Sequence, residues 1–157
     1  KLRNHGASAA FQHDEVGMNS RLDEVQAALL RIKLRTIDDN IAARQRVADQ
    51  YDARLSALGI TCPARPAMGK HAFNLYTIRS SQRDAIRSAL MDNGIGNSTC
   101  YPMPLALQAV YSGLGYSKGD FPVAEQLGHE VVSVPVFPDM TSEQVDVVCD
   151  VIANTLS

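Results

Sequence analysis

Two helical patterns follow each other almost without a gap near the start of the chain, and they constrain its fold more than any other feature of the sequence. The first covers residues 21–34 and the second residues 38–58, and in each the apolar residues recur at spacings of three and four. The apolar stripes consist of Leu22, Val25, Leu29 and Ile32 in the first helix and of Ala48, Tyr51, Leu55 and Leu58 in the second. Gly59 is typical of a helix end. We predict that the two helices join into one long bent helix near residues 36–40.

The rest of the chain alternates short β-branched and aromatic runs with further helical patterns. Three runs predict strands, at residues 71–79, 94–102 and 131–138. Helices are predicted at residues 82–93, 104–115, 121–131 and 141–156. Thr141 and Gln144 form a capping box before the last helix, and Pro135 indicates a sheet edge or a strand end. This order predicts an α+β fold, in which a small sheet is packed by helices mainly on one face.

The charge balance and the lack of long apolar runs exclude several classes of protein. The net charge is −2 and the basic residues are spread along the chain, so the sequence predicts no polybasic surface for a nucleic acid or a membrane. The chain has no tryptophan and few aromatic residues, which argues against a stacking platform for single strands. No apolar run approaches the ~20 residues that span a bilayer. We therefore expect no nucleic-acid partner and no membrane span.

The cysteines bear on metal binding and on the compartment. Cys62, Cys100 and Cys149 lie far apart in the sequence, and no C-x-x-C pair exists. Neither a zinc site nor a disulfide framework is predicted from such spacings. Free thiols in a reducing cytosol are the simplest interpretation, so we expect a cytoplasmic protein without a metal site.

Residues 1–20 differ from the rest because they are polar, contain glycine and show no period. We predict a loop or an extended arm there. The sequence begins "KLRNHG" without an initiator methionine and without the pattern of a signal peptide. We expect it to be a fragment of a longer protein.

Three segments, in the same order and register, resemble one family of enzymes. They are "RNHG…GMNSRLDEVQAALLRIKL" (residues 3–34), "NGIGNSTCYPMPLALQ" (residues 93–108) and "GDFPVAEQLGHEVVSVPVFPDMTSEQVDVV" (residues 119–148). Together they are similar to the DegT/DnrJ-type aminotransferases, which use pyridoxal phosphate to aminate nucleotide-linked keto sugars. The resemblance implies that residues 1–20 are an arm from the end of the large domain. It implies that residues 21–157 are the C-terminal small domain of a fold-type I pyridoxal-phosphate-dependent transferase, including a long helix that links the domains.

The same resemblance implies what the complete enzyme does. The lysines of this chain are Lys1, Lys33, Lys70 and Lys118, and none of them stands in the family's cofactor-lysine motif. The catalytic lysine is therefore expected upstream, no catalytic residue is expected in this chain, and the chain alone is expected to be inactive. The full-length protein is expected to be a homodimer that transfers an amino group from an amino acid, glutamate, to a nucleotide-linked keto sugar.

Two other functions remain open on the sequence. Some relatives have histidine in place of the lysine and remove a sugar hydroxyl, so a sugar dehydrase that uses the same cofactor is one alternative. A stand-alone dimerisation or binding module without a cofactor is the other.

Four residues are candidates for binding sites, and each has a second interpretation. The resemblance implies that Asn19 hydrogen-bonds the phosphate of the neighbouring subunit's cofactor, whereas the local pattern allows Asn19 or Ser20 to cap the following helix. Arg21 either supports that phosphate or a nucleotide diphosphate, or pairs with an acid on the first helix. His13 either lines the sugar-nucleotide cleft or is an exposed loop residue. Tyr101 either bounds the substrate pocket or packs in the core.

The segment around Tyr101 departs from the family pattern. Relatives often have histidine where Cys100 and Ala106 stand, at the sugar-nucleotide end of the pocket, so the resemblance implies different substrate contacts here. For Cys100 we weigh a nucleophile against a buried strand cysteine and expect the buried one, since free cysteines are often buried.

Overall fold

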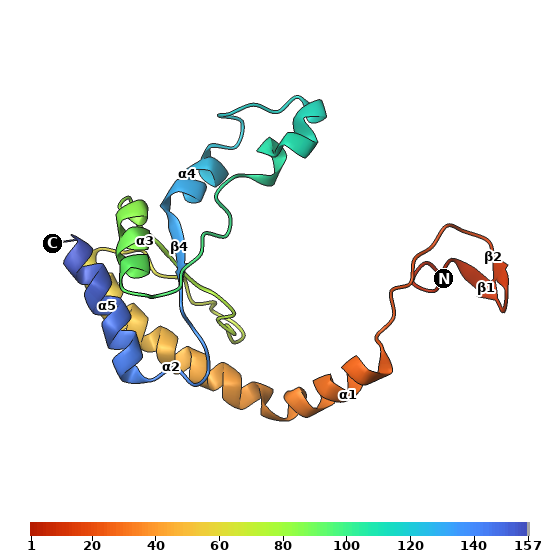
Figure 1. Ribbon diagram of the computed structural model, residues 1–157, viewed down its shortest axis with the longest axis horizontal. Coiled ribbons are helices and arrows are strands. Elements are labelled where there is room, and N and C mark those ends of the chain that lie inside the picture. The colour runs from red at the N-terminus through yellow and green to blue at the C-terminus, as the bar shows by residue number, and fades with distance from the viewer. Residues whose placement is uncertain (157) are drawn as a thin grey trace. The chain divides into compact units, whose positions relative to one another are not determined.

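The computed structural model describes residues 1–156, and the chain divides into two compact units, Lys1–Asp38 and the residues from Asp39 onward. The first unit consists of a small antiparallel hairpin, a helix and a 3-10 turn (Figure 1). These elements are β1 (Ala7–Ala9), β2 (Gln12–His13), α1 (Glu24–Lys33) and η1 (Leu34–Thr36).

The second unit combines one antiparallel strand pair with several helices. Its elements are α2 (Ile37–Leu55, which begins two residues before the boundary), η2 (Ser56–Leu58), β3 (Tyr76–Arg79), α3 (Arg83–Asp92), η3 (Leu105–Leu107), η4 (Ala109–Leu114), α4 (Pro122–Glu130), β4 (Val131–Val134) and α5 (Ser142–Leu156). The register of the strand pair runs from Tyr76 opposite Val134 to Arg79 opposite Val131. α3 lies beside α5 and also contacts β4 (Figure 1). Helices around a small sheet confirm the α+β class.

The predicted strand at residues 94–102 is wrong. Only one residue of this segment pairs with the sheet, through an isolated bridge between Ser98 and Ser133. Asn97 explains the short pairing, because its side-chain amide donates to two nearby backbone carbonyls, one of them in α3. Such local side-chain bonds compete with the ladder of a sheet.

The other two predicted strands exist but are shorter than predicted. β3 begins at Tyr76, because the preceding segment contains Phe73 with a positive φ of 44°, which extended strands do not adopt. β4 ends at Val134, directly before Pro135 and short of the predicted end at residue 138; Pro135 had indicated a sheet edge or a strand end.

The predicted helix at residues 104–115 consists of the two 3-10 segments η3 and η4. The stretch is too short to propagate an α-helix, because Pro104 precedes it and Gly113 weakens it from within. It ends at Gly115, whose left-handed backbone (φ 78°) terminates η4.

The first predicted helix begins later than expected. α1 starts at Glu24, and its N-cap residue is Asp23, whose side chain makes no capping hydrogen bond. The expectation that Asn19 or Ser20 caps this helix is therefore wrong. The predicted join is confirmed, since α1, η1 and α2 follow without interruption from Glu24 to Leu55. No side chain of α1 is buried within the described chain.

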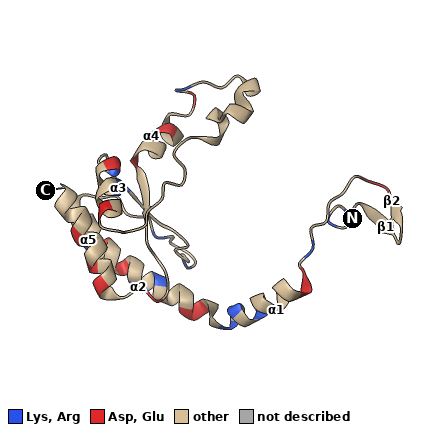
Figure 2. Cartoon of the chain, viewed as in Figure 1, with Lys and Arg blue, Asp and Glu red and all other residues tan. Residues whose placement is uncertain are grey.

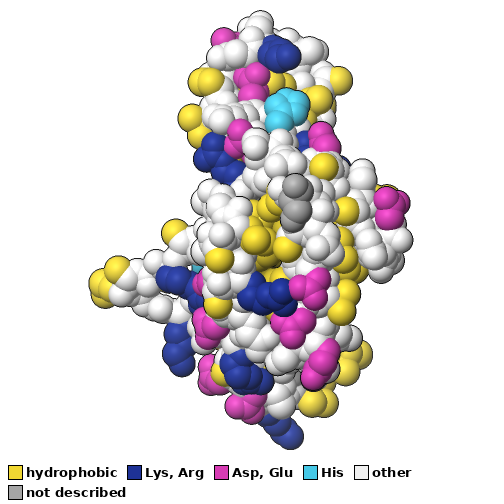
Figure 3. Space-filling model, turned by 90° about the vertical axis from the view of Figure 1, so that its left-hand side faces the viewer, with side chains coloured by type: hydrophobic (Ala, Val, Ile, Leu, Met, Phe, Trp, Pro, Cys, Tyr) yellow, Lys and Arg dark blue, Asp and Glu magenta, His cyan; other side chains and the backbone are white. Residues whose placement is uncertain are grey.

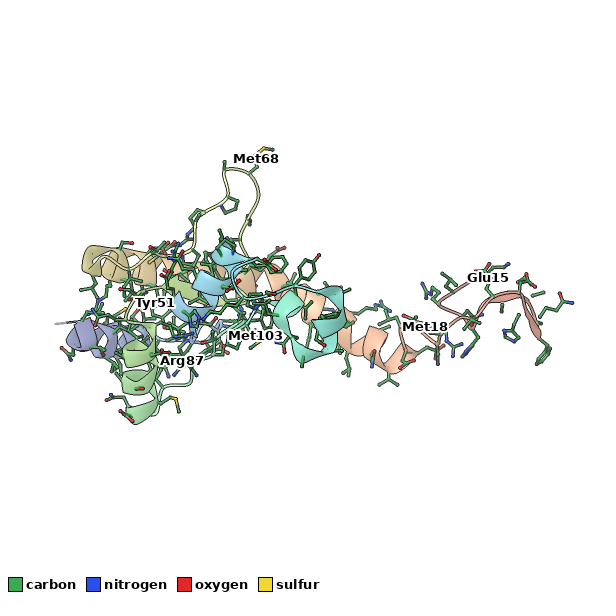
Figure 4. All side chains as sticks on the ribbon, turned by 90° about the horizontal axis from the view of Figure 1, so that it is seen from above. Glu15, Met18, Tyr51, Met68, Arg87 and Met103 are labelled. Carbon is green, nitrogen blue, oxygen red and sulfur yellow. The ribbon has the colours of Figure 1, made fainter. Side chains whose placement is uncertain are left out.

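The core of the second unit is built where periodicity predicted it. The aromatic rings of Tyr51 and Tyr76 are fully buried and lie 4.9 Å apart (Tyr51 is marked in Figure 4). The core comprises Val47, Ala48, Tyr51, Leu55, Ile60, Phe73, Tyr76, Ile78, Ile86, Leu90, Val132, Val134, Val145, Val148, Cys149 and Ile152. Leu58, predicted for the stripe of α2, instead lies in η2 and is 39% exposed.

Charged side chains join α2 to α5 across the surface. Arg54 on α2 forms ion pairs of 2.6 Å with Asp146 and 2.5 Å with Asp150 on α5. Acidic residues recur along both helices (Figure 2), and acidic and basic side chains lie side by side over the face seen in Figure 3. Because both carboxylates are largely exposed, these pairs add little to stability.

Cys149 lies on the buried face of α5, and its thiol is expected to make the second unit less stable at alkaline pH. Burial raises the pKa of its thiol from 9.0 to about 11. An acid whose pKa is higher in the folded than in the unfolded state stabilises the fold below the unfolded pKa, and loses this effect as pH rises toward the folded pKa. We expect the free energy of unfolding, measured with urea, to fall by about 1 kcal/mol between pH 8 and pH 10 through this group.

Cys149→Val is the matched control, because it keeps an apolar side chain of similar size without a titrating proton. Its free energy of unfolding should decline less over the same pH range. An equal decline in both proteins would show that Cys149 does not cause it.

Candidate functional site

The start of the chain pairs with the segment that precedes α1, and this pairing positions Asn19. Asn4 lies opposite Asn19 as an antiparallel bridge. The bridge is flanked by backbone hydrogen bonds of 3.0 Å from His5 N–H to Met18 O and of 2.9 Å from Ser20 N–H to Arg3 O. The side chains of Asn4 and Asn19 are therefore neighbours on one face of the ladder.

Two glycines allow this pairing, because the backbones approach too closely for a side chain at Gly6 and at Gly17. A Cβ atom on Gly17 would lie 2.1 Å from the backbone N of Gly6, and one on Gly6 would lie 1.9 Å from the carbonyl O of Glu15. An ion pair of 2.9 Å between Lys1 and Asp14 also links the first residues of the chain to the residues before Gly17. Glu15 and Met18 are marked in this unit in Figure 4. These contacts pack the segment that carries Asn19 closely against the start of the chain.

Asn19 and Arg21 contact each other directly. Nε of Arg21 donates to the side chain of Asn19 over 2.9 Å. Arginine has no hydrogen-bond acceptor, so the atom that Nε faces must be the amide oxygen Oδ1, and the Nδ2 group with its two N–H donors lies on the other side. Among residues 1–156, no ion pair links Arg21 to an acid, so the expected alternative of a pair with the first helix is wrong.

His13 lies on β2 in the same unit, and its side chain is exposed. Its Nδ1 lies 3.0 Å from the carbonyl oxygen of His5. A carbonyl oxygen only accepts, so Nδ1 donates in this contact. In the neutral ring, Nε2 is then the nitrogen that can accept a hydrogen bond from a ligand.

Tyr101 belongs to the second unit and is 79% exposed, so the expectation that it packs in the core is wrong. It lines a cavity of about 380 Å³ together with Met103, Leu105 and Gln108 (Met103 is marked in Figure 4). The cavity is mainly apolar, and its polar side-chain groups are the amide of Gln108 and the hydroxyl of Tyr101. Such a surface suits the apolar face of a ring better than a charged group.

The position of Tyr101 depends on two residues that sequence reasoning missed. Gly128 on α4 lies so close to the chain after Tyr101 that a Cβ atom would be 2.7 Å from Pro102 O. Arg83 is buried and donates through Nη1 to Thr99 Oγ1 (3.2 Å) and Gly128 O (3.0 Å). No sequence signal distinguishes this arginine from the exposed ones.

The guanidinium of Arg83 is partly left without partners. Its Nε lies 2.6 Å from a carboxylate oxygen of Asp84, which gives an ion pair, but this N–H is not aimed at the oxygen and makes no hydrogen bond. Arg83 is therefore placed by its Nη1 contacts, where the carbonyl at the end of α4 favours a cation.

Cys100 is half-buried and lies outside the strands, so the expected buried strand cysteine is wrong. Its Sγ lies 3.7 Å from Ser98 Oγ. Among the residues that the structure describes, no hydrogen bond links a histidine to this thiol.

The described residues also limit other kinds of site. Within residues 1–156, no group of three or more His, Cys, Asp or Glu side chains is placed to hold a metal ion. In the same range, no helix has both the length and the apolar character needed to cross a membrane.

Taken together, Asn19 and Arg21 form a set of donors suited to an anion. The two N–H groups of Asn19 and the terminal Nη nitrogens of Arg21 make no hydrogen bond that the structure describes in residues 1–156. A phosphate accepts hydrogen bonds and carries negative charge, so its chemistry matches this set.

Comparison with known proteins identifies relatives along nearly the whole chain. Residues 1–153 match the model of the DegT/DnrJ/EryC1/StrS aminotransferase family. The erythromycin biosynthesis sensory transduction protein EryC1 of Saccharopolyspora erythraea is 40% identical over 146 residues, which cover 92% of this chain and 40% of that protein. The UDP-N-acetyl-3-dehydro-alpha-D-glucosamine 3-aminotransferase of Acidithiobacillus ferrooxidans is 37% identical over 155 residues, covering 99% of this chain and 42% of that protein.

A solved structure gives the same result for the fold. The crystal structure of DesV from S. venezuelae superposes with a TM-score of 0.91 at 36% identity, over 99% of this chain and 42% of that one. The chain therefore spans about two fifths of the length of the relatives that it matches.

Proposed function

This chain belongs to the DegT/DnrJ/EryC1/StrS aminotransferase family, and we propose that it is the C-terminal part of an enzyme that transfers an amino group from glutamate to a nucleotide-linked keto sugar. The relative from A. ferrooxidans, whose name describes a 3-aminotransferase for a UDP-linked 3-dehydro sugar, supports the reaction class. The cofactor would be pyridoxal phosphate, held by a lysine outside this chain. The chain alone would then be inactive.

Each part of the chain is assigned a place in the proposed enzyme. Residues 1–20 would form an arm at the end of the large domain, and residues 21–157 the C-terminal small domain with its linking helix. The protein would be a cytoplasmic homodimer, in which the arm reaches the cofactor of the neighbouring subunit. His13 and Tyr101 would contact the sugar nucleotide, His13 through Nε2 and Tyr101 through its exposed ring.

The observation that carries the proposal is the donor set of Asn19 and Arg21. Asn19 would donate its two N–H groups to phosphate oxygens, and Arg21 would add positive charge through its terminal nitrogens. A neutral amide binds an anion without bringing its own counter-charge into the site. When bound, the cofactor supplies the electron-withdrawing ring that carries the amino group. In the proposed reaction, the residues of this chain hold and orient the cofactor and the substrate, and they move no proton.

Asn19→Ala in the full-length protein is the direct test. We expect the dissociation constant for pyridoxal phosphate, measured by fluorescence titration, to rise by about tenfold, because the hydrogen bonds from the Asn19 amide to the phosphate are lost. Asn154→Ala is the matched control, since Asn154 is an exposed asparagine on α5, and it should bind as the wild type does. Absorbance after addition of glutamate should show that the bound cofactor changes to its aminated form.

The other outcomes lead to the alternatives. A bound cofactor that glutamate leaves unchanged would favour the sugar dehydrase. No cofactor binding by the full-length wild type would contradict the proposal and leave a dimerisation or binding module.

A further inference from the structure

We propose that Arg21 is a positioning residue for Asn19, which fixes the amide so that its N–H donors, and not its oxygen, face the bound anion. The inference rests on the proposed function, because it assumes that Asn19 binds the cofactor phosphate. It assigns to Arg21 a role beyond its charge.

The geometry starts with the backbone. The segment around Asn19 is extended, since Asn19 bridges to Asn4 and Ser20 donates to Arg3 O at 2.9 Å. In an extended chain, residues two apart point to the same face, so Arg21 lies on the face of Asn19. This places the guanidinium where Nε can reach the amide over 2.9 Å.

An asparagine amide has no fixed direction of its own. Its terminal torsion is broad and roughly two-fold, so the oxygen and the NH2 group can exchange places. With the oxygen toward a phosphate, two acceptors would face each other. The Nε–H of Arg21 removes this orientation, because only Oδ1 can accept it.

The same contact strengthens the amide as a donor. A cationic group on the amide oxygen polarises the amide, and hydrogen bonds in series reinforce each other. Arg21 is free for this role because no acid pairs with it among the described residues. Its terminal nitrogens remain available for the anion.

The substitution Arg21→Lys distinguishes two roles of Arg21, its positive charge and its positioning of Asn19. Lysine keeps the positive charge but has no N–H corresponding to Nε on its stem, so it cannot hold Oδ1 in the same way. If Arg21 acted through its charge alone, Arg21→Lys would bind the cofactor nearly as the wild type does. If Arg21 positions Asn19, Arg21→Lys should behave like a loss of Asn19.

The test uses the full-length protein and four variants, with the dissociation constant for pyridoxal phosphate as the readout. We expect Arg21→Lys to raise it by about 5- to 10-fold, close to the effect of Asn19→Ala. The double variant Asn19→Ala with Arg21→Lys should bind no more weakly than Asn19→Ala, because the two residues act as one unit. Arg46→Lys, an exposed arginine on α2, is the matched control and should not change binding.

A second readout needs no cofactor. In the 15N–1H spectrum of the wild type, the side-chain amide of Asn19 should be ordered, and Arg21→Lys should increase its fast motion while Arg46→Lys does not. Three results would overturn the inference. Arg21→Lys could bind the cofactor as tightly as the wild type, or the double variant could show the product of the two single effects. The Asn19 amide could also be equally mobile in the wild type and in Arg21→Lys. Unchanged binding by Asn19→Ala would instead contradict the proposed function on which it rests.

Discussion

Replacing Gly17 with alanine is expected to separate the first six residues from the segment before α1. The new Cβ would lie 2.1 Å from Gly6 N, 2.6 Å from His5 C and 2.7 Å from Leu2 O. All three are backbone atoms, so no side-chain rotation relieves the overlap and the two segments must part. In the full-length protein, hydrogen exchange of the amides of Met18 and Ser20 should become faster on the order of 100-fold, as for a locally opened region.

Gly113→Ala is the matched control for this substitution, because a Cβ atom on Gly113 would meet nothing within 4 Å. It should leave the exchange of Met18 and Ser20 unchanged. If the proposed function holds, Gly17→Ala should also weaken cofactor binding at least as much as Asn19→Ala, since it displaces Asn19 entirely. Unchanged exchange in Gly17→Ala would mean that the pairing tolerates a side chain, contrary to the packing described.

Tyr51→Ala is expected to have the largest effect on stability. Tyr51 is fully buried, stacks beside Tyr76 with ring centroids 4.9 Å apart, and donates its hydroxyl to Pro135 O over 2.9 Å. Removing the ring leaves a cavity between α2 and the chain after β4. We expect the free energy of unfolding of the second unit, from urea titration, to fall by about 3–5 kcal/mol.

Two further variants separate the causes of this effect. Tyr51→Phe keeps the ring and removes only the hydroxyl, so it should cost about 1 kcal/mol. Tyr111→Ala removes a tyrosine that is 38% exposed and should cost clearly less than Tyr51→Ala. Equal losses for Tyr51→Ala and Tyr51→Phe would mean that the hydrogen bond, and not the buried ring, stabilises the unit.

The sequence predicted the second unit well because its helices carry strong local signals. The periodic stripe of α5 is buried at Val145, Val148, Cys149 and Ile152. The capping box that precedes it has both expected bonds, Thr141 N–H to Gln144 Oε1 at 3.0 Å and Gln144 N–H to Thr141 Oγ1 at 3.3 Å. The prediction of a strand at residues 94–102 was wrong because the side chain of Asn97 forms hydrogen bonds with nearby backbone carbonyls. The β-propensity of a sequence does not describe such bonds.

The candidate site was predicted less well, for a different physical reason. The sequence placed Asn19 next to a helix start, but residues near Asn19 pair instead with residues near Asn4, and α1 begins only at Glu24. Pairing between segments distant in the sequence leaves no local pattern. The interlocking glycines Gly6 and Gly17 were the only available signal, and their meaning depends on knowing which segments meet.

A similar limit applies to residues that act through tertiary contacts. Arg83 holds backbone carbonyls and Thr99 from a buried position, although arginine is rarely buried. The contact from Arg21 to Asn19, in contrast, spans only two positions, and an extended chain would have predicted it.

The exposed apolar residues of α1 have a consequence for the life of the polypeptide in the cell. Val25 is 74% and Leu29 58% exposed, and basic residues lie at the end of the same helix. Chaperones and proteases sort proteins by such uncovered apolar segments. If the proposed function holds, a polypeptide in which α1 stays exposed is expected to be degraded sooner than one in which the rest of the protein or a second subunit covers it, so that its steady-state abundance would report how much of α1 is covered.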